Sequence, residues 1–205
     1  VAGIQEIAVA GSNRRCKETV KDADVLVICK DSASMMEAFV NYENVDDIIA
    51  HGKTKSSIRL TSGFQVDLRV VKKVSYGAAL CYFTGSKAHG IHLRSLAQEK
   101  NYKLSEYGIF KPKSDEVSDD NSENLIRLAG EKEEDIYKQL GLQFITPELR
   151  EDRGEIEAAQ NKSLPQLVSL GDLKGDLQMH TEWSDGSTSL NNMVDNARSL
   201  GHEYI

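Results

Sequence analysis

GSNRRCKETVKDAD, residues 11–24, is the stretch that decides the fold, and it leads directly into an apolar run. Asp22 and Asp24 lie two residues apart at the mouth of VLVI, residues 25–28, which predicts a buried strand. Because side chains alternate along a strand, both carboxylates leave the same face, with their Cα atoms roughly 6.6 Å apart. The pattern predicts a pair of carboxylates at one end of a buried strand.

A third aspartate, Asp67, comes later in FQVDLRV, residues 64–70, where apolar and polar residues alternate strictly. The alternation predicts a strand with one apolar face, and Asp67 belongs to the polar face. If this strand is a neighbour of the first, three carboxylates converge, and such a cluster repels itself unless hard divalent cations occupy it. The three aspartates therefore predict a two-metal site for phosphoryl transfer.

A glycine–serine pair precedes the aspartates. Residues 4–10 predict a short strand that runs into Gly11 and Ser12 and then into a helix. This arrangement suits a phosphate group, because glycine lets the backbone approach the anion and the start of a helix offers free N–H groups. Arg14 and Arg15 add guanidinium donors. Alone, the pair also marks ordinary turns, but together with the three aspartates it predicts a nucleotidyltransferase.

Length and composition limit the class of protein. The chain has 205 residues, of which 40% are hydrophobic, and this is enough for a sizeable core in one domain or two. It begins with Val1 rather than methionine, so we expect a piece of a longer protein. No stretch is apolar for long enough to span a membrane, and no leader is visible. Three cysteines without metal-ligand spacing predict reduced thiols, so we expect a soluble, cytoplasmic monomer.

The formal net charge of −7 divides unevenly along the chain. Residues 1–113 carry 17 Lys and Arg against 12 Asp and Glu, a net charge of +5, whereas residues 114–205 carry 8 against 20, a net charge of −12. Three acids of the basic half are the proposed metal ligands, so with metal bound this half presents a more positive surface to a polyanion. The acidic half has the composition of solvated helix faces.

A second informative block is SYGAALCYFTGSKAHGIHLR, residues 75–94, in which Ser86 predicts the N-cap of a helix. Helical periodicity predicts two faces, with Lys87, Gly90, Arg94 and Gln98 on one and Ala88, Ile91, Ser95 and Leu96 towards the core. Glycine costs a helix about 1 kcal/mol relative to alanine. A basic face with a central glycine therefore indicates either close approach of a ligand or nucleic acid, or a slightly weak surface helix.

His89 and His92 in the same block are three residues apart. This spacing could place both on a metal ion, but no third ligand is nearby in the sequence. We therefore expect both histidines on the surface of the helix.

The remaining segments predict an α+β protein. Residues 34–42 predict a helix with an apolar stripe, and residues 45–50 and 57–61 predict short strands separated by turns. We expect a mixed sheet backed by helices on one side, with the carboxylates on the open face. Residues 114–122 predict a polar, acidic loop, and residues 124–141 predict one or two short helices.

The order of the motifs resembles a known family. GSNRRCKETVKDADVLV, FQVDLRVV, YGAALCYFTGSKAHGIHLR, LSEYGIF and PELREDRGEIEAA follow one another as in the bacterial and archaeal family X DNA polymerases, relatives of DNA polymerase beta. The terminal GDLQMHTEWSDG resembles the start of the polymerase-and-histidinol-phosphatase (PHP) domain of those proteins. The resemblance implies a catalytic palm over residues 1–73, a thumb over 74–150, a linker over 151–172 and the start of a PHP domain over 173–205.

The resemblance also implies a reaction, the transfer of a nucleotide from a dNTP to the 3′-hydroxyl of a DNA primer paired to a template, in gap-filling repair. Asp22 and Asp24 would bind two ions, Mg²⁺ or Mn²⁺, and Asp67 would bind the catalytic ion beside the primer terminus. Two other classes stay open, a nucleic-acid-binding scaffold whose transferase has decayed and a delivery module for a PHP phosphoesterase or exonuclease. The family's N-terminal DNA-binding part is missing, so we expect the fragment alone to bind nucleotide weakly and to polymerise poorly.

Further residues are assigned by the same resemblance. The nucleotide-binding residues would be Gly11, Ser12, Arg15, Tyr82, Phe83 and Gly85. In this assignment the arginine and serine hold phosphates, the aromatic pair flanks the sugar and base, and the Gly85–Ser86 peptide bond is cis. The DNA-binding residues would be Lys87, Gly90 and Arg94.

Three positions depart from the family pattern. Lys21 stands where glycine is usual, and Gly90 stands where asparagine usually contacts the nascent base pair. Gln178 replaces the first histidine of the PHP His-x-His pair, which leaves His180 and Asp185 as possible ligands of a degraded site. We therefore expect no exonuclease or phosphatase activity from this tail.

Overall fold

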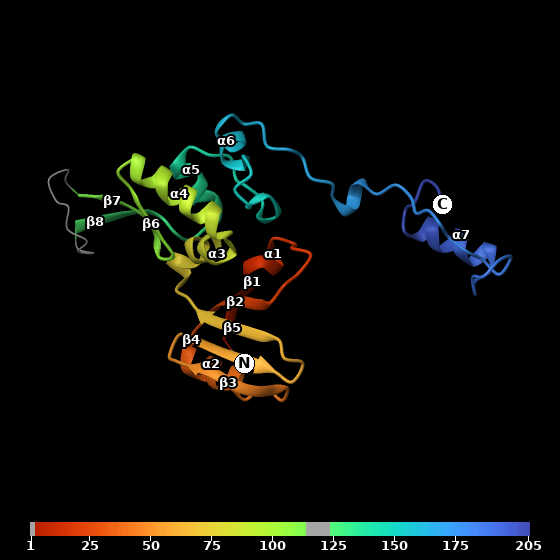
Figure 1. Ribbon diagram of the computed structural model, residues 1–205, viewed down its shortest axis with the longest axis horizontal. Helices are drawn as coiled ribbons and strands as arrows, with labels where there is room; N and C mark the ends of the chain where they lie inside the picture. Colours follow the sequence, from red (N-terminus) through yellow and green to blue (C-terminus); the bar gives the residue numbers. More distant parts are fainter. Residues whose placement is uncertain (1–2, 114–123) are drawn as a thin grey trace. The chain divides into compact units, whose positions relative to one another are not determined.

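The structure is a computed structural model that describes residues 3–113 and 124–205. Contacts divide the chain into two compact units, Val1–Leu164 and Pro165–Ile205. Figure 1 shows the elements of both units coloured along the chain. The acidic loop expected over residues 114–122 lies outside the described residues.

The first part of the Val1–Leu164 unit is a five-stranded sheet. Its strands are β1 (Ile4–Val9), β2 (Asp22–Cys29), β3 (Val45–His51), β4 (Lys55–Leu60) and β5 (Gln65–Val70). They lie in the order β1-β2-β5-β4-β3, in which β2 and β5 run parallel and the other neighbours run antiparallel. Each strand that the sequence predicts in this region is present, and the mixed sheet and α+β class are confirmed.

One face of this sheet is covered by helix α2 (Ser32–Val40). Met35 and Met36 of α2 are buried against Val27 of β2 and Leu68 of β5. The helix begins two residues earlier than expected because Asp31 caps it, its carboxylate accepting hydrogen bonds from the backbone N–H groups of Ala33 and Ser34.

The opposite face carries the aspartates and is covered only in part. Helix α3 (Tyr76–Thr84) buries Leu26 and Ile28 of β2 beneath Tyr76 and Leu80. Asp22 and Asp24 share this face, because side chains alternate along β2, but they lie nearer the start of the strand. The face that we expected to be open is therefore open around the carboxylates and closed by α3 beyond them.

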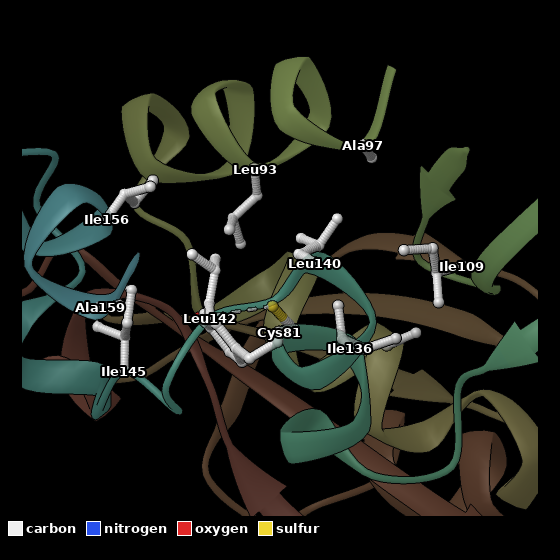
Figure 2. Close-up of a cluster of buried hydrophobic side chains, with 12 residues drawn as sticks. Cys81, Leu93, Ala97, Ile109, Ile136, Leu140, Leu142, Ile145, Ile156 and Ala159 are labelled. Carbon is white, nitrogen blue, oxygen red and sulfur yellow. Dashed lines mark hydrogen bonds between the residues drawn. The ribbon is translucent and has the colours of Figure 1, made fainter. Parts of the chain in front are cut away.

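The rest of the Val1–Leu164 unit is helical around a small antiparallel sheet, β6-β7-β8. Its further elements are η1 (Lys73–Ser75), α4 (Lys87–Glu99), β6 (Lys103–Ser105), β7 (Gly108–Pro112), β8 (Leu125–Ala129), α5 (Glu133–Leu140), η3 (Pro147–Leu149) and α6 (Glu155–Gln160). Figure 2 shows the core that these elements share, in which buried side chains include Cys81, Leu93, Ile109, Ile136 and Ile156.

Two segments of this part differ from expectation. The expectation of only helices over residues 124–141 is wrong for its first half, because Leu125–Ala129 pairs with β7 as a strand and only Glu133–Leu140 is helical. Where we expected a linker over residues 151–172, the structure has helix α6, whose Ile156 and Ala159 are buried in the core of Figure 2.

Helix α4 begins at Ser86 as expected, with the hydroxyl accepting a hydrogen bond from the backbone N–H of His89. The core face predicted for it is wrong, because His89, Leu93 and Ala97 are buried, whereas Ala88, Ile91 and Ser95 are exposed and Leu96 is half-buried. The surface position predicted for His89 is wrong for the same reason. Its ring is only 1% exposed because buried polar partners on two other helices satisfy both ring nitrogens.

The Pro165–Ile205 unit contains η4 (Leu170–Asp172), α7 (Leu190–Ser199) and a bridge between Gly175 and Tyr204. Much of its apolar surface is exposed, with Trp183 at 86%. So short a segment buries little apolar area by itself. Nowhere in residues 3–113 and 124–205 does a helix combine the length and apolar character needed to cross a membrane.

Candidate active site

The loop between β1 and β2 starts with helix α1 (Gly11–Arg14), a single turn. Gly11 has a φ of +65°, and a Cβ at this position would lie 2.7 Å from Oδ2 of Asp24. Ala10 also donates a backbone hydrogen bond of 2.7 Å to the carbonyl oxygen of Asp24. Glycine is therefore required at position 11 by backbone conformation and by the close approach of the carboxylate.

Asp24 and Asp67 are direct partners in the parallel pairing of β2 with β5, and Asp22 pairs with Gln65 two residues earlier. All three carboxylates belong to the same face of the sheet. Burial raises the pKa of Asp24 above its ordinary value, and the negative charges of Asp22 and Asp67 raise it further. The structure thus places the three aspartates on two adjacent strands of one sheet face.

Asp67 is held by three neighbours on its own face. Gln65 donates a hydrogen bond of 2.9 Å to Oδ1, and Nζ of Lys55 lies 3.4 Å from Oδ2. Burial alone would raise the pKa of Asp67, but hydrogen bonds from Gln65 and Ser57 and the charge of Lys55 outweigh it, so the pKa lies below its ordinary value. The carboxylate is ionised and oriented, which suits a cation ligand.

The three aspartates have the right ligand atoms for a metal ion, but their side chains are not close enough together to bind one as they stand. Carboxylate oxygens are the ligands that Mg²⁺ prefers, and clustered negative charge favours a cation. Within residues 3–113 and 124–205, however, no three His, Cys, Asp or Glu side chains stand close enough together to hold one ion. Asp22, Asp24 and Asp67 therefore have to adjust their side chains if they are to share one.

Sequence reasoning missed Lys55, Ser57 and Gln65. The signal was present, since Gln65 lies two residues before Asp67 on the same alternating strand. Ser57 and Lys55 could not be placed in the same way, because their positions beside Asp67 and Arg69 depend on the register of β4 against β5. That register is set by the sheet and not by the local sequence.

The two arginines of the α1 loop have different surroundings. Arg14 donates hydrogen bonds of 3.0 Å and 2.6 Å to the two carboxylate oxygens of Glu133 and one of 2.8 Å to the hydroxyl of Thr84. Arg15 donates to Glu151 at 2.8 Å and to the backbone carbonyl of Thr84 at 2.6 Å. Both arginines are therefore fixed to the helical part of the unit.

Tyr82, Phe83 and Gly85 lie at the C-terminal end of α3. Tyr82 is half exposed, and its ring meets that of Phe83 edge-on at 5.1 Å. The guanidinium of Arg69 lies 4.2 Å from the Phe83 ring, and that of Arg94 lies 5.7 Å from the Tyr82 ring. Gly85 has a φ of +70°, and the Gly85–Ser86 peptide bond is cis, as the resemblance implies.

The DNA-binding residues proposed on α4 lie near this aromatic pair. Lys87 is exposed, and Gly90 and Arg94 are half-buried. Gly90, Arg94 and Tyr82 line one small cavity. Among the described residues, a Cβ at Gly90 would meet Nη1 of Arg94 alone, at 3.6 Å, and none of them requires glycine at this position.

A cavity of about 730 Å³ lies between strands β4 and β5 and the small sheet of the helical part. Cationic side chains from both parts line it, namely Lys55, Arg69, Lys72, Lys103 and Arg127. The aromatic rings of Phe83, Tyr107 and Phe110 also contribute to the wall. Such a lining combines positive charge with flat apolar surface and therefore suits a nucleotide or a nucleic-acid strand.

The residues of the presumed PHP site lie in the Pro165–Ile205 unit. Nδ1 of His180 is 2.7 Å from Oδ1 of Asp185, and both side chains are exposed. Gln178 adopts a φ of +58°. Two ligands on an exposed loop are too few to hold a transition metal against water.

Known proteins are similar to this chain along most of its length. Residues 79–151 match the family model of the DNA polymerase beta thumb. The DNA polymerase/3′-5′ exonuclease PolX of Bacillus subtilis is 35% identical over 198 residues, which are 96% of this chain and 33% of that protein. Repair DNA polymerase X of African swine fever virus is 26% identical over 152 residues, which are 71% of this chain and 82% of that protein.

A solved structure, polymerase beta of Leishmania infantum in a ternary P/T complex, covers 71% of this chain and 67% of its own, with a TM-score of 0.56 and 22% identity. This likeness shows a shared fold. The chain spans about one third of the length of the B. subtilis protein. The thumb match, the PolX similarity and the polymerase beta fold agree with the order of motifs in the sequence, and together they support a family X DNA polymerase.

Proposed function

We propose that this chain contains the palm and thumb of a DNA-directed DNA polymerase that transfers a nucleotide from a dNTP to a primer 3′-hydroxyl. The observation that carries the proposal is the pairing of Asp24 with Asp67, with Asp22 on the same face and Gly11 against Asp24. Carboxylates on adjacent strands beside a phosphate-binding loop are what metal-assisted phosphoryl transfer requires. The palm would cover residues 1–73 and the thumb residues 74–150.

Two divalent ions, Mg²⁺ or Mn²⁺, would be held by Asp22, Asp24 and Asp67. When bound, such ions activate the attacking hydroxyl and neutralise charge on the leaving pyrophosphate. The chain's own contribution is to orient the carboxylates. Gln65 and Lys55 fix Asp67, and the close approach of Gly11 fixes the position of the loop beside Asp24.

The nucleotide would lie between the α1 loop and the end of α3. Ser12 and Arg15 would bind its phosphates, with backbone N–H groups near Gly11. Tyr82 and Phe83 would flank the sugar and base. Arg15 belongs to the α1 loop and donates a hydrogen bond to the backbone carbonyl of Thr84 at the end of α3. This contact supports a single site made from the two elements.

The DNA would contact the basic side chains around the cavity. Lys55 of β4, Lys72 just after β5 and Arg127 of β8 line it and suit a phosphate backbone. Lys87, Gly90 and Arg94 on α4 would contact the nascent base pair and the template. The name of one relative, a repair DNA polymerase X, supports a role in DNA repair, and we propose that this role is gap filling.

The test is single-nucleotide incorporation into a gapped primer–template with each dNTP and Mg²⁺ or Mn²⁺. Templated, metal-dependent extension of the primer is the expected result. DNA binding without extension under all metal conditions would instead favour a scaffold that has lost its transferase. Adding EDTA serves as the control, since it removes the ions and leaves the fold in place.

We propose that residues 173–205 are the start of a PHP domain without activity of their own. His180 and Asp185 form an exposed pair, and Gln178 offers a neutral amide where an imidazole is expected. The name of the B. subtilis relative includes a 3′-5′ exonuclease, so a delivery role for a phosphoesterase is the alternative. We further propose that the protein is a monomer and that it is cytoplasmic, since the free cysteines Cys16, Cys29 and Cys81 fit a reducing compartment.

A further inference from the structure

The turn after η3, Arg150–Glu155, is attached to other elements at several positions. Arg150, which is fully buried, donates a hydrogen bond of 2.7 Å to Glu133, and its carbonyl oxygen accepts one of 2.9 Å from the N–H of Ser86. Asp152 is 2.9 Å from Nδ1 of His92. Neighbours on both sides therefore hold Glu151 in place.

Glu155 closes the same turn. Its carboxylate is 2.6 Å from Nδ1 of His89 and accepts backbone hydrogen bonds from Asp152 at 2.8 Å and Arg153 at 2.6 Å. A turn whose backbone N–H groups and side chains are bound in this way has little freedom to move. The backbone that carries Glu151 is therefore rigid before any ligand arrives.

Glu151 extends from this turn to the α1 loop, 136 positions away in the sequence. Its Oε1 accepts a hydrogen bond of 2.8 Å from Nε of Arg15 and lies 3.6 Å from Nζ of Lys17. The side chains of Arg15 and Glu151 are only 12% and 20% exposed, so water screens the pair weakly.

Arg15 is held on two of its nitrogens. Nε donates to Glu151, and Nη1 donates to the carbonyl oxygen of Thr84. Arginine carries further N–H donors on Nη1 and Nη2, and within the described residues Nη2 makes no hydrogen bond. Two anchors on a planar group fix its orientation and leave donors free for a phosphate oxygen.

Glu151 is ionised at neutral pH. Partial burial would raise the pKa of Glu151, but the hydrogen bond and charge of Arg15 and the charge of Lys17 outweigh it, so the pKa lies below its ordinary value. The Glu151 carboxylate would weaken phosphate binding by Arg15 if it accepted hydrogen bonds from the N–H donors that the phosphate needs. It occupies Nε only.

We propose that Glu151 is a positioning residue for triphosphate binding, which locks the guanidinium of Arg15 so that its unused donors face the β and γ phosphates of the incoming nucleotide. This inference rests on the proposed function, because it assumes that Arg15 binds phosphate. Glu151 touches neither nucleotide nor metal. It acts through Arg15, and it makes the phosphate site depend on the turn that ties α4 and α5 together.

Removal of the Glu151 carboxylate should affect only ligands that carry β and γ phosphates. Without the Glu151 carboxylate, the Arg15 side chain has no fixed orientation in the free protein. The nucleotide then has to order this side chain when it binds, which weakens the binding free energy. A nucleoside monophosphate has no β or γ phosphate and does not use Arg15. Removing Glu151 therefore weakens the binding of a triphosphate and leaves that of a monophosphate unchanged.

The experiment uses the whole chain with Mg²⁺, titrated with dATP and with dAMP in a calorimeter, for the parent, Glu151→Gln and Glu148→Gln. Glu148 is an exposed carboxylate on the neighbouring η3 and serves as the matched control. We expect Glu151→Gln to bind dATP about tenfold more weakly, the loss of roughly one charged hydrogen bond, with dAMP binding and the control unchanged.

Two further variants separate positioning from a general effect on the fold. Glu151→Asp keeps the charge and should restore part of the dATP affinity. In an Arg15→Lys background, Glu151→Gln should have no further effect on dATP binding, because the group that it positions is gone. Circular dichroism melts of each variant confirm folding, and if Glu151→Gln does not fold, Glu151→Asp carries the test.

Three results would overturn the inference. Equal dATP affinity of parent and Glu151→Gln would show that Arg15 needs no anchor, while leaving the proposed function intact. Tighter dATP binding by Glu151→Gln would show that the carboxylate competes with the phosphates. No measurable dATP binding by the parent would remove the inference together with the nucleotide site on which it rests.

Discussion

Asp24 of β2 and Asp67 of β5 face each other directly across two parallel strands, although the segments that carry them are separated in sequence by α2, β3 and β4. Burial raises the pKa of Asp24 most, and the negative charges of Asp22 and then of its partner Asp67 raise it further. The two carboxylates therefore repel each other in the folded protein, and a bound cation would remove this repulsion.

The first prediction concerns stability without metal. Because the folded-state pKa of Asp24 is raised, its stability contribution is lost as pH rises above the unfolded value of about 3.9. In EDTA at pH 7, Asp24→Asn should therefore melt higher than the parent, by roughly 2–4 °C for each 1 kcal/mol of relieved repulsion.

Divalent ions should reverse this order, because Mg²⁺ stabilises the parent and has little to bind in Asp24→Asn. Thermal melts followed by circular dichroism with EDTA and with Mg²⁺ measure both effects. A parent that melts higher than Asp24→Asn in EDTA would show that the carboxylates do not repel one another in the folded state.

The second prediction concerns the buried ion cluster between the α1 loop and the thumb. Glu133 binds Arg14 and Arg150 with one carboxylate, and Arg150 is fully buried. Glu133→Ala leaves the Arg150 charge without its partner and should lower the free energy of unfolding by about 3–5 kcal/mol.

Urea unfolding followed by circular dichroism measures this loss, with Glu134→Ala, an exposed neighbour on α5, as the control. The control should change stability by less than about 0.5 kcal/mol. If both variants unfolded at the same urea concentration, the ion cluster would contribute nothing to the junction.

The third prediction concerns Gly90 in α4. In the part of the chain that the structure describes, a Cβ there meets Nη1 of Arg94 alone, at an ordinary contact distance of 3.6 Å. Alanine is a better helix former than glycine by about 1 kcal/mol, so Gly90→Ala should raise stability by up to that amount.

The contrasting variant is Gly77→Ala in α3, where a Cβ would lie 2.2 Å from the carbonyl carbon of Lys132. That substitution should destabilise the protein strongly, since backbone atoms cannot yield. Chemical denaturation of both variants gives the comparison, and a stabilised Gly77→Ala would refute the close packing of α3 on the start of α5.

The fourth prediction is a pH dependence from His89. Burial lowers the pKa of His89, and its hydrogen bond to Glu155 only partly offsets this. A histidine with a lowered folded pKa contributes stability that is present above its unfolded value of about 6.5 and is lost as pH falls below it.

Between pH 6.5 and about 5, the stability of the parent should therefore fall, by at most about 1.4 kcal/mol per pH unit. The pKa of Glu155 lies below its ordinary value, so the stability that Glu155 contributes is lost only at pH values below this range. His89→Gln should flatten the slope in urea titrations, and an unchanged slope would assign the dependence to another group.

The sequence predicted the palm well because its strands are strongly patterned. Strict alternation in FQVDLRV fixes the face of Asp67, and the apolar run after Asp24 fixes a buried strand. The convergence of the aspartates then needs only that these strands be neighbours, and β2 pairs with β5.

The thumb was less predictable because its signals are short or ambiguous. LIRLA, residues 125–129, is an apolar run of strand length that is also compatible with a helix, and only pairing with β7 decides between them. The buried face of α4 is set by His89, whose partners Tyr137 and Glu155 come from distant segments. Charged residues such as Glu151 and Arg150 gave no signal, because their roles depend on contacts that only the fold creates.

The most direct test of the central claim is the single-turnover rate of nucleotide incorporation by the parent and by Asp67→Asn. Protein in excess over a gapped primer–template, with the matching dNTP and Mg²⁺, compensates for weak DNA binding. Asp46→Asn, an exposed aspartate on β3 of the same sheet, is the control. We expect the parent and the control to extend the primer by one templated nucleotide and Asp67→Asn to fold normally without extending it. Extension by Asp67→Asn at the parental rate would contradict the assignment of Asp22, Asp24 and Asp67 as the metal site.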